Sequence, residues 1–243
     1  MLSEINSNRY TIKIADTDEY VEAALKLRYE VFKEELARNF KFKGEKDKDE
    51  FDDQSHHLIV VENDTDTVVG TYRLQTYEQA IKGNGFVSGK RFHLEQLSDE
   101  ILKEAVEVGR ACIRREHRSG RVLFMLWKGF ANYLTFFNKQ YLFGYAALES
   151  TNPNVALNTF AHLKENGFIH PKYQIEPKDE YKIRIQQNGT DKIDIPPLFQ
   201  NYLDVGCTIC SQPSFDKNIE LAHFIILLDI ETISDRTRKL FFS

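Results

Sequence analysis

The spacing of hydrophobic and polar positions predicts alternating strands and helices along the chain. Residues 10–14 alternate between apolar and polar side chains, which is typical of a short strand. Asp16 and Glu19 then form a capping-box pattern, and they predict a helix that continues to about Leu36. At about 100° per residue, Arg28 falls on or beside the apolar stripe of this helix. We therefore expect the Arg28 guanidinium to be buried and to pair with a carboxylate, and the candidate partners are Asp49 and Asp52.

The next segment reads as a β-hairpin. Two apolar, β-branched runs at residues 58–62 and 67–75 flank Asn63-Asp64-Thr65-Asp66, whose residue types favour a tight turn. A glycine-rich loop at residues 82–89 follows. The remaining pattern predicts a helix near 97–104, a strand at 106–113, an amphipathic helix at 122–137, a strand at 141–148, a helix at 154–165, and a C-terminal helix and strand, the strand at 224–229.

This order of elements predicts one α/β or α+β sheet domain flanked by helices. We expect a single domain over residues 1–243, with a core at about 10–185 and a C-terminal helix–strand extension at about 190–243. No repeat, low-complexity tract or long linker divides the chain into two domains.

Composition supports a globular protein of the cytoplasm. Of 243 residues, 42% are hydrophobic and 28% are charged, and the net charge of −5 argues against a binder of nucleic acid. The longest apolar run is about eight residues, whereas a membrane-spanning helix needs about 20. Three cysteines and an N-terminus without an apolar leader predict a reducing compartment and no disulfide framework.

Positive charge is concentrated in one segment. Residues 110–121 contain five arginines against Glu116. This basic turn lies between a predicted strand and the first turn of a predicted helix, where free backbone N–H groups and the helix dipole attract anions. The turn is therefore a candidate site for a phosphate, a pyrophosphate or an acidic partner protein, and a solvated basic surface is the alternative.

Glu107 is a carboxylate within an otherwise apolar strand. In such a place it could act as a general base toward an amine, or it could only form an ion pair with Arg110 or Arg73. Residues 107 and 110 face opposite sides of a regular strand, but a β-bulge near Gly109 would bring them to one side.

Cys207 and Cys210 form an isolated Cys-x-x-Cys pair. Zinc would need about two further ligands, and the sequence has no second cluster to supply them, so no metal site is expected. A structural role is the simplest interpretation of the two cysteines.

Five segments together resemble the acyl-carrier-protein-dependent N-acyltransferases. This family includes ornithine-lipid N-acyltransferases, long-chain N-acyl amino acid synthases and, more distantly, acyl-homoserine-lactone synthases. The similar segments are the Arg-Tyr-x-Val-Phe helix at residues 27–35, the Asp-x-Phe-Asp element at 49–52, the His-Leu-Leu-Val strand at 57–60, the Gly-Thr-Tyr-Arg-Leu strand at 70–74 and the Glu-x-Gly-Arg element at 107–110.

The resemblance extends from about Tyr20 to Asp229 and implies a GNAT fold, with a mixed, mostly antiparallel central sheet. Residues 154–168 are similar to a later helix of that fold, and residues 202–207 are similar to a C-terminal motif of the ornithine branch. The pantetheine-binding loop is represented only by residues 118–121. Lactone synthases usually carry Trp-Glu-x-Ser-Arg where this chain has Val106-Glu107-Val108-Gly109-Arg110, which favours the ornithine branch.

The resemblance implies transfer of a fatty acyl group from a phosphopantetheine thioester to the amine of an amino acid such as ornithine. It assigns three sets of residues: catalytic Glu107 and Arg110; substrate-binding Arg28, Phe32, Asp49, Asp52 and Arg73; and, for the acyl donor or carrier protein, Arg114, Arg115, Arg118, Gly120 and Arg121.

The resemblance implies no permanently bound cofactor, since the thioester of acyl carrier protein or coenzyme A is a substrate. Expected partners are acyl carrier protein and a small amine, with peripheral membrane contact through the lipid product. Two alternatives remain open: an acyl-homoserine-lactone synthase that uses S-adenosylmethionine, and a non-catalytic module that binds an acyl chain or a carrier protein.

Overall fold

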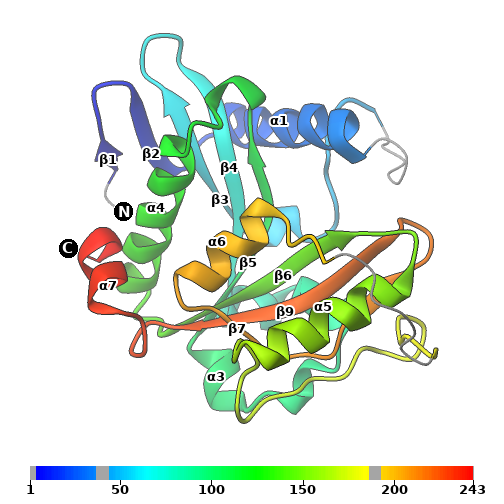
Figure 1. Cartoon of the computed structure of the whole chain (residues 1–243). Helices are drawn as coiled ribbons and strands as arrows, with labels where there is room; N and C mark the ends of the chain where they lie inside the picture. The colour runs from blue at the N-terminus through cyan, green and yellow to red at the C-terminus, as the bar shows by residue number, and fades with distance from the viewer. Residues whose placement is uncertain (1–3, 37–43, 186–192, 243) are drawn as a thin grey trace. The chain divides into compact units, whose positions relative to one another are not determined.

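The computed structural model describes residues 4–36, 44–185 and 193–242, which form two compact units (Figure 1). Unit 1 comprises residues 1–85, 106–139 and 236–243, and unit 2 comprises residues 86–105 and 140–235. The predicted boundary between core and extension, at 185–190, lies largely outside the described residues. That the whole chain acts as a single domain stays a prediction.

Unit 1 contains an antiparallel sheet in which consecutive strands are neighbours. In the register of this sheet, Leu58 of β3 is opposite Tyr72 of β4, and Arg73 of β4 is opposite Gly109 of β5. Its strands are β1 (Ile5–Asn6), β2 (Tyr10–Ile14), β3 (His56–Glu62), β4 (Thr67–Thr76) and β5 (Ala105–Ile113), and its main helices are α1 (Asp18–Leu36) and α4 (Arg121–Phe136).

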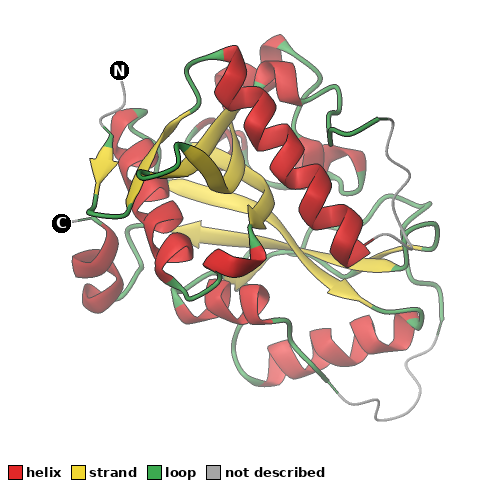
Figure 2. Cartoon of the chain, turned by 90° about the horizontal axis from the view of Figure 1, so that it is seen from above, coloured by secondary structure: helices red, strands yellow, loops and turns green. Residues whose placement is uncertain are grey.

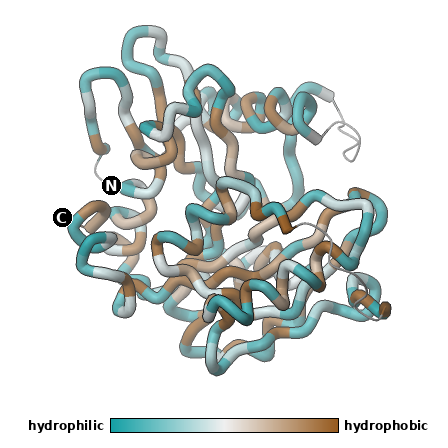
Figure 3. The backbone as a smooth tube through the Cα atoms, in the orientation of Figure 1, coloured by the Kyte–Doolittle hydropathy of each residue, from teal (hydrophilic) through white to brown (hydrophobic). Residues whose placement is uncertain are grey.

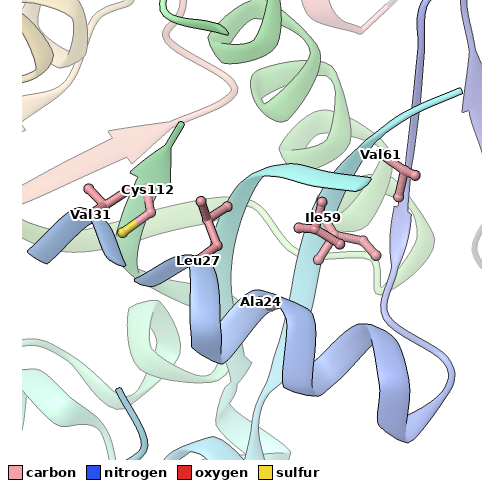
Figure 4. Close-up of a cluster of buried hydrophobic side chains, with 7 residues drawn as sticks. Ala24, Leu27, Val31, Ile59, Val61 and Cys112 are labelled. Carbon is pink, nitrogen blue, oxygen red and sulfur yellow. The ribbon is translucent and has the colours of Figure 1, made fainter. Parts of the chain in front are cut away.

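The two long helices cover opposite faces of this sheet (Figure 2). Ile59 belongs to the buried cluster that packs against Leu27 of α1, and Figure 4 shows these two side chains together. The neighbouring residue Leu58 points to the other face, because a Cβ placed at Gly129 of α4 would lie 2.8 Å from its side chain. Only glycine allows α4 to approach the sheet this closely.

Strand β5 carries a β-bulge that aims one side chain. Arg73 pairs with Gly109 and Thr71 pairs with Cys112, so the bulged strand holds an extra residue between the two pairs. Arg110 lies within this bulge and has φ +54°, the left-handed region that side chains rarely adopt. A bulge near Gly109, the condition for residues 107 and 110 to share one side, is therefore present, although the residue with positive φ is the arginine and not the glycine.

Unit 2 has its own antiparallel strand pairs and peripheral helices. Strand β9, the predicted C-terminal strand, pairs with β6 along its whole length, so it is an integral part of a sheet. Its continuous hydrophobic character is visible in Figure 3. The elements are β6 (Tyr141–Glu149), β7 (Thr208–Ile209), β8 (Ser214–Asp216), β9 (Leu221–Asp229), α3 (Asp99–Lys103), α5 (Pro153–Glu165) and α6 (Pro197–Asp204).

Short helices complete the described chain. They are η1 (Asp52–Gln54), α2 (Tyr77–Lys82), η2 (Val87–Lys90), η3 (Leu94–Gln96), η4 (Arg115–His117) and α7 (Asp235–Phe241). Among the helices in the described ranges, none combines the length and apolar character needed to cross a bilayer.

The sequence located most elements correctly, but it misplaced the start of α1. The capping box at Asp16 and Glu19 was wrong: the hydroxyl of Thr17 accepts a hydrogen bond from the Tyr20 backbone N–H, at 3.4 Å. Thr17 can serve as N-cap because its hydroxyl reaches the free N–H groups of the first turn.

Candidate active site

Three arginines and three aspartates form a closed ring of ion pairs in unit 1, on the α1 side of its sheet. The charges alternate around the ring and sum to zero. Its members are Arg28 from α1, Asp47 and Asp49 from the loop before η1, Asp52 from η1, Arg73 from β4 and Arg110 from the bulge of β5.

The buried half of the ring centres on Arg28, whose side chain is fully buried. Its Nη1 donates to Asp52 Oδ1 at 2.6 Å, and its Nη2 lies 2.7 Å from Asp47 Oδ2. Arg73 Nη1 also donates to Asp52 Oδ1, at 3.1 Å. Each buried charge therefore has an opposite partner, which offsets the cost of removing it from water. The predicted pairing of Arg28 with Asp52 is confirmed, whereas Asp49 is not its partner.

The other half of the ring reaches solvent. Arg73 Nη1 donates to Asp49 Oδ1 at 2.6 Å, and Arg110 Nη2 donates to Asp49 Oδ2 at 3.0 Å. Arg110 Nε lies 3.1 Å from Asp47 Oδ2, which closes the ring. The side chains of Asp49 and Arg110 are 20% and 27% exposed. These two residues are the members of the ring that a small charged molecule can approach.

The ring fixes the protonation state of its most buried pair, Asp52 and Arg28. Burial alone would raise the pKa of Asp52, but the hydrogen bond and charge of Arg28, together with the charge of Arg73, hold that pKa well below its usual range. Burial would likewise lower the pKa of Arg28, and the two aspartates raise it instead. Asp52 and Arg28 are therefore both ionised at neutral pH.

Local hydrogen bonds hold the acidic segment 47–52 in a conformation in which its aspartates contact the three arginines of the ring. Asp52 Oδ2 accepts the backbone N–H of Asp49 at 2.8 Å, and Asp49 Oδ1 accepts that of Phe51 at 2.9 Å. Phe51 is buried, and the centre of its aromatic ring lies 5.7 Å from the guanidinium carbon of Arg73. The Asp-x-Phe-Asp spacing thus gives two carboxylates that turn the chain and one aromatic ring that anchors it.

Glu107 lies on the same side of the sheet as the ring. It pairs with Gln75 across the two strands, two residues from the pair of Arg73 and Gly109, so its side chain shares the face of Arg73. The bulge brings Arg110 to this face too, since Arg110 contacts the same aspartates as Arg28 and Arg73. The glutamate is 5% exposed. The structure therefore brings together the two residues predicted to be catalytic.

His57 stands beside the ring on the neighbouring strand. It pairs with Arg73 in the sheet, and its Nε2 lies 3.9 Å from Asp52 Oδ1. Neither ring nitrogen has a hydrogen-bond partner within the described part of the chain, and the side chain is 2% exposed. Burial lowers the pKa of His57 to about 4, and the adjacent arginine charges act in the same direction. His57 is therefore neutral at pH 7.

The basic turn is matched by acidic residues of α1. Arg114 pairs with Glu30 at 2.9 Å, and Arg115 pairs with Glu34 at 2.8 Å. Arg118 pairs with Glu35. These are exposed ion pairs, which contribute little to stability. They partly neutralise the turn, so its positive charge is smaller than the sequence alone indicates.

The remaining predicted donor residues lie where the turn meets α4. Gly120 is the N-cap of α4 with φ +89°, and it is followed by the exposed Arg121. A Cβ added at Gly120 would meet nothing within 4 Å, so the backbone is approachable there. Phe32 of α1 lies beside Arg110: the centre of its aromatic ring is 5.8 Å from the Arg110 guanidinium carbon.

Cys207 and Cys210 are buried free thiols, as the structural interpretation of this pair predicts. Burial raises the pKa of Cys210 to about 12, so both cysteines stay protonated and unreactive. Within residues 4–36, 44–185 and 193–242, no group of three or more His, Cys, Asp or Glu side chains could hold a metal ion.

Sequence reasoning missed Asp47 and His57 as members of the site. Asp47 lies in a stretch with six acidic residues at 45–53, and spacing alone does not indicate which of them turn inward. His57 was noted only as part of a strand motif. A polar residue that opens an apolar strand is the signal that could have identified it.

The ring generates a stability prediction. Arg28→Ala is expected to lower the free energy of unfolding by about 3–5 kcal/mol, because Asp47 and Asp52 would stay buried without their cation. Chemical denaturation measures this change. Arg9→Ala is the matched control, since Arg9 pairs with Glu62 at the surface and its loss should change the stability little. Equal effects of the two substitutions would show that the ring does not stabilise the fold.

His57 generates a pH prediction. Its pKa is about 4 in the folded protein and about 6.5 in the unfolded chain, so protons bind the unfolded state preferentially between these values. Stability from this group is therefore complete above pH 6.5 and falls by about 3 kcal/mol as pH drops to 4. His57→Leu should flatten the curve of unfolding free energy against pH in that window. A curve of unchanged slope would contradict the assignment.

Several known proteins are similar to this chain, both across the site and over most of its length. Residues 27–128, which include every member of the ring, match the family described as "Acetyltransferase (GNAT) domain". An L-ornithine N(alpha)-acyltransferase of Brucella abortus (strain 2308) is 28% identical over 249 residues, covering 93% of this chain and 86% of that protein. A protein of the same name from Rhodobacter capsulatus is 26% identical, covering 96% of this chain and 94% of its own.

A solved structure supports the same fold. The CoA-dependent acyl-homoserine lactone synthase BjaI, with SAM and isopentyl-CoA, superimposes with a TM-score of 0.51 at 17% identity. The superposition covers 92% of this chain and 81% of BjaI. The fold class and the resemblance predicted from sequence are therefore confirmed, and this chain is an acyltransferase enzyme with the GNAT fold.

Proposed function

We propose that this enzyme transfers a fatty acyl group from an acyl-carrier-protein thioester to the amine of an amino acid such as ornithine. The observation that carries the proposal is the neutral ring, whose exposed members Asp49 and Arg110 share one face with Glu107. A zwitterion needs a cation and an anion side by side, and this pair supplies both. The similarity to ornithine acyltransferases supports the choice of acceptor.

The acceptor can bind without leaving any charge unpaired. Its carboxylate can pair with Arg110, whose side chain lies at the exposed side of the ring and is 27% exposed. A side-chain ammonium, as in ornithine, can pair with Asp49. The buried pairs of Arg28 and Asp52 keep their partners, so they act as the rigid base of the site.

In the reaction, the neutral α-amine attacks the thioester carbonyl carbon, so that a C–N bond forms and the C–S bond breaks. Glu107 accepts the proton that the amine loses, directly or through one water. The proton then passes to the departing thiolate, which leaves as the phosphopantetheine thiol. Attack converts the thioester carbonyl oxygen to an oxyanion, which backbone N–H groups near a strand opening can stabilise. The protein also contributes by holding the two reactants in contact.

The basic turn is the proposed contact for the donor. Arg121 and the N-terminus of α4 can receive the phosphate, while Arg114, Arg115 and Arg118 face an acidic carrier protein. A coenzyme A thioester is the alternative donor. Both donors carry the same phosphopantetheine arm, so only the contact of the turn with an acidic carrier protein distinguishes them.

Two other activities remain as alternatives. A lactone synthase would use the same ring with S-adenosylmethionine, and a carrier-binding module would use only the turn. The juxtaposition of Glu107 and Arg110 on one face favours an enzyme over a module, since binding a carrier needs no buried base. A location in the cytoplasm stays a prediction.

A thiol-release assay tests the proposal. Purified enzyme, acyl-carrier-protein thioester and ornithine should release free thiol and form an amide in equal amounts. Release that requires S-adenosylmethionine instead would support the lactone synthase. Carrier binding without release in the presence of any amine would support the non-catalytic module.

If Glu107 is the base, Glu107→Gln should lower kcat by about 10²–10⁴ with little loss of stability. The deficit should shrink as pH rises, because more of the free amine is already neutral. Steady-state kinetics over a pH range measure both effects. Glu165→Gln, at the exposed end of α5, is the matched control and should retain full activity. Near-native turnover of Glu107→Gln at neutral pH would remove Glu107 from the mechanism.

If the turn receives a carrier protein, Arg115→Glu with Arg118→Glu should raise the KM for that protein severalfold and leave the acceptor KM nearly unchanged. Added salt should weaken association in the same way. Glu34→Gln with Glu35→Gln is the control, since it frees these arginines from their partners and should lower the carrier KM. If neither added salt nor the charge reversal changes the KM for the carrier protein, the donor is instead a coenzyme A thioester bound outside the turn.

A further inference from the structure

Two helices of unit 1 form a surface that combines exposed apolar side chains with basic ones. Phe124 and Lys128 lie one turn apart on α4, and Arg236, Lys239 and Leu240 lie on α7. We call these five residues the α4–α7 surface. None of its residues belongs to the ring, to the basic turn or to the predicted catalytic pair.

The packing of α7 determines which of its side chains face outward. Phe241 packs against α4, with ring centres 5.4 Å from Phe124 and 5.6 Å from Trp127 (Figure 1). Thr237, one turn earlier, is buried on the same side of α7. Arg236 and Leu240 share a different side of the helix, where Arg236 is exposed and Leu240 is 41% exposed.

The surface combines two exposed apolar side chains, Phe124 and Leu240, with three basic ones. Phe124 is 38% exposed although it contacts Phe241, and the Lys128 ammonium lies 5.8 Å from its ring centre. Helix α4 has no acidic residue, and α7 has only Asp235 against three basic residues. This charge stands out in a chain of net charge −5.

We propose that the α4–α7 surface docks on an anionic lipid bilayer, with Phe124 and Leu240 inserted among the headgroups and the basic side chains on lipid phosphates. Basic residues flanking exposed aromatic and aliphatic side chains fit such a surface in both charge and polarity. The proposed function gives a reason for the contact, because an amino acid that carries a fatty acyl chain is an amphiphile that partitions into membranes.

Vesicle co-sedimentation of the full chain, without acyl donor or acceptor, tests the proposal. The protein should bind phosphatidylglycerol vesicles, bind pure phosphatidylcholine vesicles weakly, and dissociate as salt is added. Arg236→Glu with Leu240→Ser should weaken binding to the anionic vesicles at least about tenfold, with the melting temperature near that of the wild type.

The matched control is Lys164→Glu with Phe136→Ser. Lys164 is exposed on α5 of unit 2, and Phe136 is 52% exposed but lies about 120° around α4 from Phe124. This variant should bind vesicles like the wild type.

Absence of vesicle binding by the wild type, or an equal loss in both double variants, would overturn the proposal. A test variant that keeps vesicle binding and loses affinity for acyl carrier protein would make the surface a protein interface instead. Because no substrate is present, failure of the proposed acyl transfer would leave the vesicle result unchanged, so the two ideas fail separately.

Discussion

The structure of unit 1 depends on a fully buried arginine. Arg28 cannot lose its charge inside a protein, so folding must surround it with carboxylates or leave an unpaired buried cation. Asp47 and Asp52 meet this demand, and they come from a loop whose own hydrogen bonds hold them in place. The requirement ties α1 and the acidic loop together, and Arg73 joins both to the sheet.

The exposure of the side chains increases across the ring, from a buried end to an end that reaches solvent. Asp52 and Arg28 are sealed, whereas Asp49 and Arg110 reach solvent. The bulge of β5 makes this edge possible, since a regular strand would send Arg110 to the opposite face from Glu107. The demand for charge balance thus leaves a cation, an anion and a buried carboxylate on one face, and the proposed acyl transfer to an amino acid would use all three.

The sequence predicted the parts of this site that follow from local rules. Arg28 falls on an apolar helical stripe, and a strand with a glycine next to an arginine favours a bulge, so both features could be inferred in advance. The choice of Asp47 as a partner could not, because the path of the loop is set by tertiary contacts with α1. The glutamates opposite the basic turn were missed for the same reason: Arg115 and Glu34 are 81 residues apart in sequence.

The most direct measurement is mass spectrometry of lipid extracts from cells that express this chain and are fed isotope-labelled ornithine. The account predicts a new labelled species with the mass of an amide between ornithine and a fatty acid, absent when Glu107→Gln is expressed. An acyl-homoserine lactone in its place, or no new acylated amine with the wild-type chain, would contradict it.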